Sequence, residues 1–193
     1  KYFYTQDDYP PLVRLAFIHY QFEAIHPFSD GNGRAGRLLL TLLLVSWQLL
    51  PLPLLYLSAY FENTRQQYYN HLLEISQKNA WREWINYFLQ GIISQSQDTI
   101  ERIKRLQDIQ HRWHDKLFAA KASASTIQLA DYLFEAPIVS IPHVQRLFGM
   151  SYRGAKLVVK RLLDLGLLAP ADERVYGKSF VATEILTEIL RSH

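Results

Sequence analysis

The chain has 193 residues, of which 49% are hydrophobic and 20% charged, a composition typical of globular proteins that hold one large domain or two smaller ones. It contains no cysteine, which excludes a disulfide scaffold, a thiolate metal site and a cysteine nucleophile. The net charge of +3 is spread evenly along the chain, so neither half has the strong basic excess of a dedicated nucleic-acid binder.

The first part of the chain reads as a series of helices. Apolar residues recur at spacings of three and four from Leu12 to Ile25, which predicts a helix that ends before Pro27. A turn-rich stretch follows, and a second helix is predicted over about 33–50. Three more helices are predicted over Glu62–Lys78, Ala80–Ile93 and Gln97–Lys121. We therefore expect residues 1–121 to form an almost entirely helical domain.

The most apolar stretch, from Leu38 to Leu57, is interrupted by polar residues and by Pro51 and Pro53. Its uninterrupted part before Pro51 holds 13 residues, too few for a helix that spans a bilayer. We interpret this part as a buried core helix and expect no membrane association. Since no signal peptide is visible and cysteine is absent, we expect a cytoplasmic protein.

The pattern changes after the small residues at 122–125, which mark a candidate domain boundary. Ser140 and Ser151 are placed to cap two helices, the second of which should end at Gly166. An earlier helix is predicted over Thr126–Glu135, and short strands over Ile138–Val139, Leu167–Ala169 and Ser179–Ala182. Residues 122–193 are therefore predicted to form a winged helix-turn-helix, which makes the whole chain mainly α.

The densest chemistry lies in the twelve residues from His26 to Arg37, where a loop becomes a helix. Gly31, Asn32 and Gly33 permit strained backbone geometry, so successive N–H groups can point at one anion. The positive end of the helix dipole favours the same anion. A Gly-Asn-Gly alone is more often a simple turn, and only the joint occurrence of these features predicts a phosphate site.

The side chains around these glycines fit the same reaction. Arg34 and Arg37 are three residues apart and supply two guanidinium groups on one helix face. Asp30 is an oxygen ligand for a Mg²⁺ ion that bridges phosphates. A neutral His26 could take a proton from an attacking hydroxyl group. Together these groups predict nucleophilic attack on a phosphorus atom of a nucleotide.

This stretch resembles the Fic family motif, His-Pro-Phe-x-Asp/Glu-Gly-Asn-Gly-Arg-x-x-Arg, at every fixed position. Residues 10–117 resemble the core of bacterial Fic proteins, and the C-terminal part resembles the winged-helix domain often appended to it. The resemblance implies a protein adenylyltransferase that transfers AMP from ATP, with Mg²⁺, to a Ser, Thr or Tyr hydroxyl of a target protein or of the chain itself. AMP removal by the same site is an alternative.

The resemblance also implies roles for individual residues. His26 would be the general base, Phe28 would anchor the loop in the core, and Asp30 would bind Mg²⁺. Tyr68 and Tyr69 match family positions near the adenine pocket, although an aromatic packing face is an equal alternative for this pair. The nucleotide-binding residues implied in this way are Gly31, Asn32, Gly33, Arg34, Arg37, Tyr68 and Tyr69.

Two family elements have no counterpart in the sequence. Fic enzymes usually carry an upstream β-hairpin flap that aligns the target, and many have a regulatory helix whose Glu pairs with the second motif arginine. Residues 1–25 contain a single glutamate, Glu23, without the context of such a helix. Either the chain is a fragment that has lost both elements or they lie elsewhere, and we expect the fragment.

A nucleic-acid role for the C-terminal domain is the main alternative to catalysis. Acidic residues dilute the positive charge, so DNA binding is less favoured than packing or protein docking. A nucleotide-sensing DNA-binding regulator and a homodimer also stay open. The basic residues concerned are Arg153, Lys156, Lys160 and Arg161 on the presumed recognition helix and Arg174 and Lys178 in the presumed wing.

Overall fold

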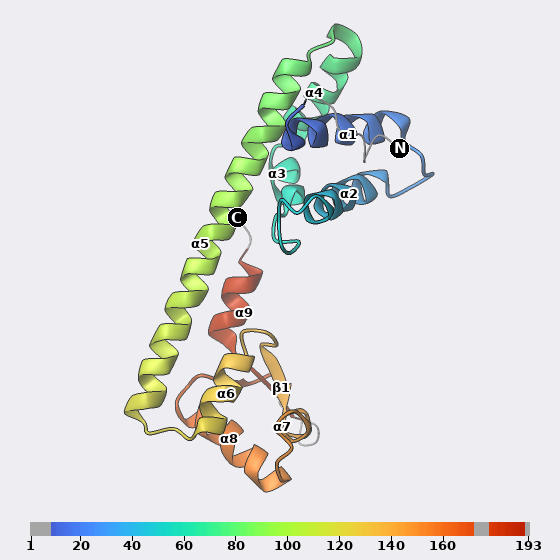
Figure 1. The fold of residues 1–193 in the computed structure, drawn as a ribbon. Helices are drawn as coiled ribbons and strands as arrows, with labels where there is room; N and C mark the ends of the chain where they lie inside the picture. Colours follow the sequence, from blue (N-terminus) through green and yellow to red (C-terminus); the bar gives the residue numbers. More distant parts are fainter. Residues whose placement is uncertain (1–8, 172–177, 192–193) are drawn as a thin grey trace. The chain divides into compact units, whose positions relative to one another are not determined.

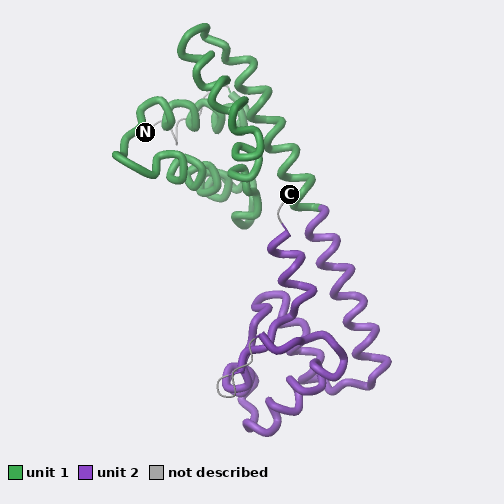
Figure 2. The backbone as a smooth tube through the Cα atoms, turned by 180° about the vertical axis from the view of Figure 1, so that it is seen from behind, with its two compact units in different colours: residues 1–100 green, residues 101–193 purple. Residues whose placement is uncertain are grey.

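The computed structural model describes residues 9–171 and 178–191. Helices dominate these residues and the strands are short, which confirms the predicted mainly α fold (Figure 1). The chain divides into two compact units, residues 1–100 and residues 101–193, which are shown in separate colours in Figure 2. Among the described residues, no helix has the length and apolar character needed to cross a membrane.

Unit 1 is built from helices alone within its described residues. Its core holds the indole of Trp84 and the ring of Phe88, both fully buried, together with Leu15 of the first helix and Leu40 of the second. The Trp84 Nε1–H donates to the carbonyl oxygen of Ala16 at 3.0 Å, which ties the long fifth helix to the first. The helices are α1 (Pro11–Ile25), α2 (Asn32–Ser46), α3 (Leu57–Asn63), α4 (Arg65–Lys78) and the first part of α5 (Trp81–Ala119).

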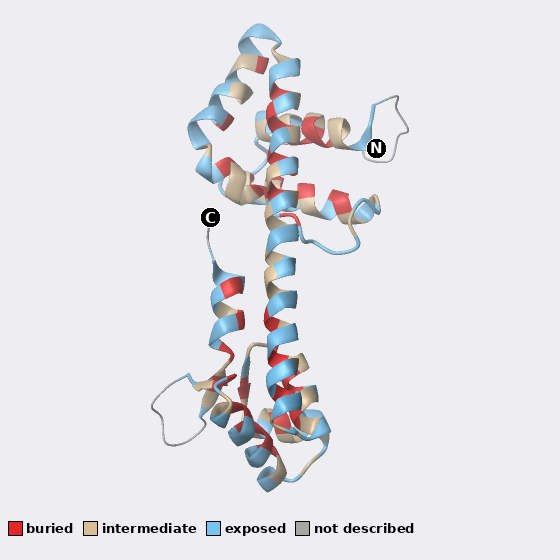
Figure 3. Cartoon of the chain, turned by 90° about the vertical axis from the view of Figure 1, so that its left-hand side faces the viewer, coloured by how far each residue is buried: buried red, intermediate tan, exposed pale blue. Residues whose placement is uncertain are grey.

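Helix α5 differs from the sequence prediction. It is one continuous helix of 39 residues, whereas the sequence predicts separate helices over Ala80–Ile93 and Gln97–Lys121. The intervening Ser-Gln-Ser contains no proline or glycine, and such residues lower helix propensity only slightly. Buried positions of the helix fall in two stretches, 84–95 and 109–117, so tertiary packing stabilises these two parts of it (Figure 3).

The boundary between the units also lies elsewhere than the sequence suggests. It falls between residues 100 and 101, inside α5, and not between 121 and 122. The reason is that Ile109, Trp113 and Leu117 in the second part of α5 are buried in the core of unit 2. The assignment of residues 1–121 and 122–193 as separate functional domains stays a prediction.

Unit 2 combines helices with a small antiparallel sheet. The strands lie in the order β1-β3-β2, with Val139 opposite Phe180 and Ala169 opposite Val181. Helix α9 is not predicted by the sequence, because eight residues near the chain end carry only two turns of apolar periodicity. The elements are α6 (Ala124–Tyr132), β1 (Ile138–Ser140), α7 (Ile141–Phe148), α8 (Tyr152–Asp164), β2 (Ala169–Pro170), β3 (Ser179–Val181) and α9 (Thr183–Leu190).

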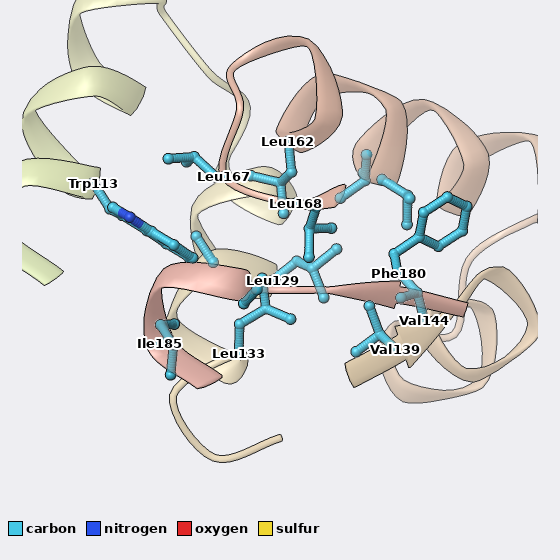
Figure 4. Close-up of a cluster of buried hydrophobic side chains, with 14 of the residues drawn as sticks. Trp113, Leu129, Leu133, Val139, Val144, Leu162, Leu167, Leu168, Phe180 and Ile185 are labelled. Atoms are coloured by element: carbon cyan, nitrogen blue, oxygen red, sulfur yellow. The ribbon is translucent and has the colours of Figure 1, made fainter. Parts of the chain in front are cut away.

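The core of unit 2 is apolar and closely packed (Figure 4). Leu129 of α6, Val144 of α7 and Leu162 of α8 are each 0% exposed. The predicted caps Ser140 and Ser151 are confirmed. The side-chain oxygen of Ser140 accepts from the His143 N–H at 3.4 Å, and that of Ser151 accepts from the Gly154 N–H at 3.1 Å. The order α7, turn, α8, β2, β3 follows the predicted helix-turn-helix, while the winged-helix assignment itself stays a prediction.

Candidate active site

The site begins where α1 ends. His26 is the C-terminal cap of α1 and takes a left-handed backbone conformation with φ of 51°, while its N–H donates to the carbonyl oxygen of Phe22 at 3.0 Å. This conformation turns the chain out of the helix just before Pro27. The His26 ring is exposed, and its Nδ1 lies 3.4 Å from the backbone oxygen of Glu23.

The loop that follows is closed by the Asn32 side chain. Its Oδ1 accepts from the Phe28 N–H at 2.8 Å, and its Nδ2 donates to the Phe28 carbonyl oxygen at 2.5 Å. Asn32 is 2% exposed, so these bonds lie out of water and fix the loop geometry. The sequence predicts Asn32 only as part of the anion hole, but its side chain also holds the loop together.

Phe28 is not the anchor that the family resemblance implies. Its ring is 54% exposed, and its centroid lies 6.3 Å from that of the Phe22 ring. The expectation of a core position is therefore wrong in this structure. The Asn32 amide binds the backbone of Phe28, so the loop closes without burying the phenyl ring.

The start of α2 is open to an anion. Gly31 precedes the helix with φ of 79°, a left-handed conformation that glycine adopts without strain, and it has no side chain to cap the helix. The first intrahelical bond runs from the Ala35 N–H to the Gly31 carbonyl oxygen at 2.9 Å. The N–H groups of Asn32, Gly33 and Arg34 therefore have no partner within the helix.

The two motif arginines lie in different surroundings. Arg34 Nη2 is 3.6 Å from Asp30 Oδ2, but these side chains are 79% and 93% exposed, so the pair contributes little to stability. Arg37 folds back along the helix, and its Nη1 lies 3.0 Å from the position that a Cβ on Gly33 would occupy. Its guanidinium group therefore covers the first turn of α2.

Asp30 fits a metal ion whose other ligands are waters and phosphate oxygens. The described residues contain no group of three or more His, Asp or Glu side chains that could hold a metal ion. Mg²⁺ keeps several waters and binds nucleotide phosphates, so one protein carboxylate is sufficient when the phosphates supply further ligands. The exposed Asp30 beside the open helix end meets this requirement.

A polar cavity of about 360 Å³ brings the predicted residues together. It also includes Glu62 and Arg65, which the sequence does not predict; they share a helical spacing with Tyr69, the only local signal that could have found them. The Arg65 guanidinium lies 5.8 Å from the centroid of the Tyr69 ring and 3.9 Å from the Glu62 carboxylate. The lining residues are His26, Ser29, Asp30, Gly31, Asn32, Gly33, Arg34, Arg37, Glu62, Arg65 and Tyr69.

Tyr68 is the one predicted site residue that the structure does not bring to this cavity. It is 5% exposed, and its hydroxyl is 3.0 Å from Nε2 of the fully buried His19. Burial raises the pKa of Tyr68 and lowers the pKa of His19 to about 3, with a further lowering from the charge of Arg37. Tyr68 thus packs in the core of unit 1, while Tyr69 is 52% exposed and faces the cavity.

A larger cavity in unit 1 lacks this chemistry. It measures about 950 Å³ and is lined mainly by apolar and aromatic side chains, among them Phe17, Ile18 and Trp81. Neither the glycine loop nor the motif arginines reach it. The smaller polar cavity is therefore the candidate active site, because it alone among the described cavities collects a base, a carboxylate and an open helix end.

The basic residues of α8 lie in unit 2. Arg153, Lys156 and Lys160 are exposed, whereas Nη2 of Arg161 donates to the carbonyl oxygen of Ala120 at 2.6 Å. Lys178 is also exposed, and Arg174 lies outside the described residues. DNA binding by this helix stays a prediction.

Comparison with known proteins gives information on the part of unit 1 that contains the glycine loop. Residues 1–44, which include the whole glycine loop, match the family model described as Fic/DOC family. Over this segment the chain is similar to Fic-family proteins. Protein adenylyltransferase fic-1 of Caenorhabditis elegans and that of Caenorhabditis briggsae are each 51% identical to the chain over 35 residues. Protein adenylyltransferase Fic of Aedes aegypti is 54% identical over 35 residues.

These matches are local. Each covers 18% of this chain and 7% of the relative, so the chain spans only a small part of the curated Fic proteins that it matches. A solved Fic family protein from Desulfovibrio desulfuricans G20 aligns with 92% of this chain and 50% of its own, at 19% identity and a TM-score of 0.48. The similarity to Fic proteins therefore lies in the N-terminal segment and its motif.

Proposed function

We propose that this Fic-family chain is a protein adenylyltransferase that moves AMP from ATP to a Ser, Thr or Tyr hydroxyl of a target protein or of itself. The main observation that supports this proposal is the polar cavity lined by His26, the open start of α2 and the two motif arginines. Positioning and charge stabilisation are the main protein contributions to such transfers. The name shared by the curated relatives, protein adenylyltransferase, supports the same reaction.

The cavity suggests where the phosphates of ATP bind. The free N–H groups at the start of α2 would hold the α-phosphate, and Arg34 and Arg37 would bind the outer phosphates. Asp30 would hold Mg²⁺, whose charge offsets that of the phosphates. The exposed ring of Tyr69, with Arg65 beside it, offers a stacking surface for the adenine.

His26 is placed to accept the proton of the attacking hydroxyl. When Nδ1 carries the ring hydrogen and donates to the Glu23 carbonyl oxygen, Nε2 keeps its lone pair as the base. The hydroxyl oxygen then forms a bond to the α-phosphorus as the bond to pyrophosphate breaks. The products are the AMP-modified protein, pyrophosphate and a proton held on His26.

The first experiment compares the parent chain with His26→Ala after incubation with ATP and Mg²⁺. Intact-mass spectrometry should show addition of one AMP to the parent, and the initial rate should fall about 100-fold or more in the variant. Binding of ATP, measured by calorimetry, should be nearly unchanged, because His26 acts on the hydroxyl and not on the phosphates.

The exposed His111 on α5, outside the cavity, provides a matched control, and His111→Ala should modify itself at the parent rate. Transfer by His26→Ala at the parent rate would show that His26 is not the base. A parent chain that neither binds ATP nor acquires AMP would contradict the proposed function.

A further inference from the structure

Beneath the candidate active site lies a carboxylate that the reaction outlined above does not use. Glu23 is on α1, one turn before the end of the helix at His26. Its Oε1 is buried and has no hydrogen-bond partner among the described residues. A buried carboxylate oxygen without a donor is costly, so its presence at this position calls for a physical reason.

The close approach of α1 to α2 brings this carboxylate into place. A Cβ added to Gly36 would lie 2.6 Å from Glu23 Oε1 and 3.0 Å from Cδ1 of Phe22. Any larger residue at position 36 would therefore displace the Glu23 side chain or the Phe22 ring. Gly36 directly precedes Arg37, so the space left by this glycine admits the Glu23 carboxyl group to the turn of α2 that carries the second motif arginine.

The electrostatic surroundings identify the groups that this charge acts on. Burial raises the pKa of the Glu23 carboxyl, while the positive charges of Arg37 and, to a smaller extent, of His26 act in the opposite direction. Among the described residues, Arg37 has no carboxylate within ion-pair distance, whereas Arg34 has the exposed Asp30. Glu23 is thus a partly buried carboxyl group whose charge acts on Arg37 from beyond ion-pair distance.

We propose that Glu23 is a positioning residue that holds the Arg37 guanidinium toward the cavity for the outer phosphates of ATP. This inference rests on the proposed function. A long arginine side chain loses rotamer freedom when it is fixed on a phosphate, and a carboxylate behind it removes part of that cost before the ligand arrives.

The test is a double-mutant cycle on the binding of ATP with Mg²⁺, measured by calorimetry. It compares the parent with Glu23→Ala, Arg37→Ala and the double variant. Glu23→Ala should weaken binding on the order of tenfold, a size typical of coupled neighbours. Arg37→Ala should weaken it further, and adding Glu23→Ala to Arg37→Ala should change nothing more, because Glu23 acts through Arg37.

Conservative and control variants separate positioning from loss of fold. Glu23→Gln keeps the size and one acceptor oxygen, so its affinity should lie between those of the parent and Glu23→Ala. The exposed Glu83 on α5 gives a matched control, and Glu83→Ala should bind ATP like the parent. Thermal unfolding of each variant would show whether a lost fold, and not a lost contact, weakens binding.

The outcomes of these experiments distinguish failure of the positioning role from failure of the proposed function. Additive losses in the double variant, or tighter ATP binding by Glu23→Ala, would overturn the positioning role. If the parent chain does not bind ATP at all, the proposed function fails and this inference fails with it. If ATP binds and His26→Ala blocks transfer while the cycle is additive, only the positioning role is wrong.

Discussion

Two helices, α2 in unit 1 and α8 in unit 2, each begin directly after a tight turn, but their first turns differ. The Ser151 side chain caps α8 by accepting from the Gly154 N–H at 3.1 Å. The residue in the same place before α2 is Gly31, which has no side chain and leaves the first N–H groups of the helix open. A helix whose first N–H groups are hydrogen-bonded to a capping side chain is stabilised by that cap. A helix without a cap has N–H groups that can bind a ligand.

Burial shows the same contrast. Behind the start of α8, Ala155, Val159 and Leu162 are at most 1% exposed. At the start of α2, the charged side chains of Asp30 and Arg34 are in solvent. Helices α3 and α4 also lack side-chain caps, so an open start alone is not a site. What distinguishes α2 is the left-handed glycine together with a base and two arginines.

The largest expected effect on stability comes from the core behind the capped helix α8. Leu162→Ala removes a fully buried side chain from the core of unit 2 and should lower the free energy of unfolding by about 2–5 kcal/mol. Urea titration followed by circular dichroism would measure this loss. ATP affinity, measured under native conditions, should stay unchanged, and a tenfold weaker affinity would break the separation between the two regions.

A smaller loss of stability is expected from a change in the loop before α2. Asn32→Ala removes both hydrogen bonds to the Phe28 backbone and leaves buried polar groups unpaired, at a cost of about 1–3 kcal/mol. Unlike the core variant, it should also weaken ATP binding about tenfold, because the loop loses its fixed geometry. Calorimetry would measure the affinity.

The exposed Asn70 on α4 serves as the control for this variant, and Asn70→Ala should leave ATP affinity as it is. An Asn32→Ala protein with parent affinity would show that the loop keeps its geometry without the side-chain amide.

The smallest effect concerns the cap itself. Ser151→Ala should cost about 1 kcal/mol of stability, the usual price of a lost N-terminal cap, with no change in ATP affinity. Urea titration beside Ser151→Asp, which keeps an acceptor oxygen at this position, provides the measurement. Equal losses in both variants would show that the cap contributes nothing to the stability of unit 2.

The parts of the fold that were predictable depend on local chemistry. Ser140 and Ser151 mark helix starts because their oxygens reach N–H groups three residues away, and Gly166 ends a helix because it takes a positive φ of 69°. The continuity of α5 was not predictable, since packing along the helix outweighs the weak local break at 94–96. Helix α9 was too short to show its periodicity.

The candidate site divides in the same way. The segment from His26 to Arg37 is contiguous, so its residues could be identified from the sequence alone. Glu62 and Arg65 reach the cavity through the packing of α3 and α4, and their helical spacing with Tyr69 is the only local pattern that points to them. The two adjacent tyrosines are separated by helix geometry, which buries Tyr68 and exposes Tyr69.

The exposed pair of Asp30 and Arg34 has a consequence for how the metal arrives. A bare Mg²⁺ ion would meet one carboxylate and, 3.6 Å from it, a positive charge that repels the ion. Under the proposed function, phosphates at the start of α2 would draw Arg34 toward them and leave the carboxylate free. Asp30 would then hold Mg²⁺ only together with the nucleotide, so the concentration of the Mg²⁺–ATP complex, not of free Mg²⁺, would determine the occupancy of the site.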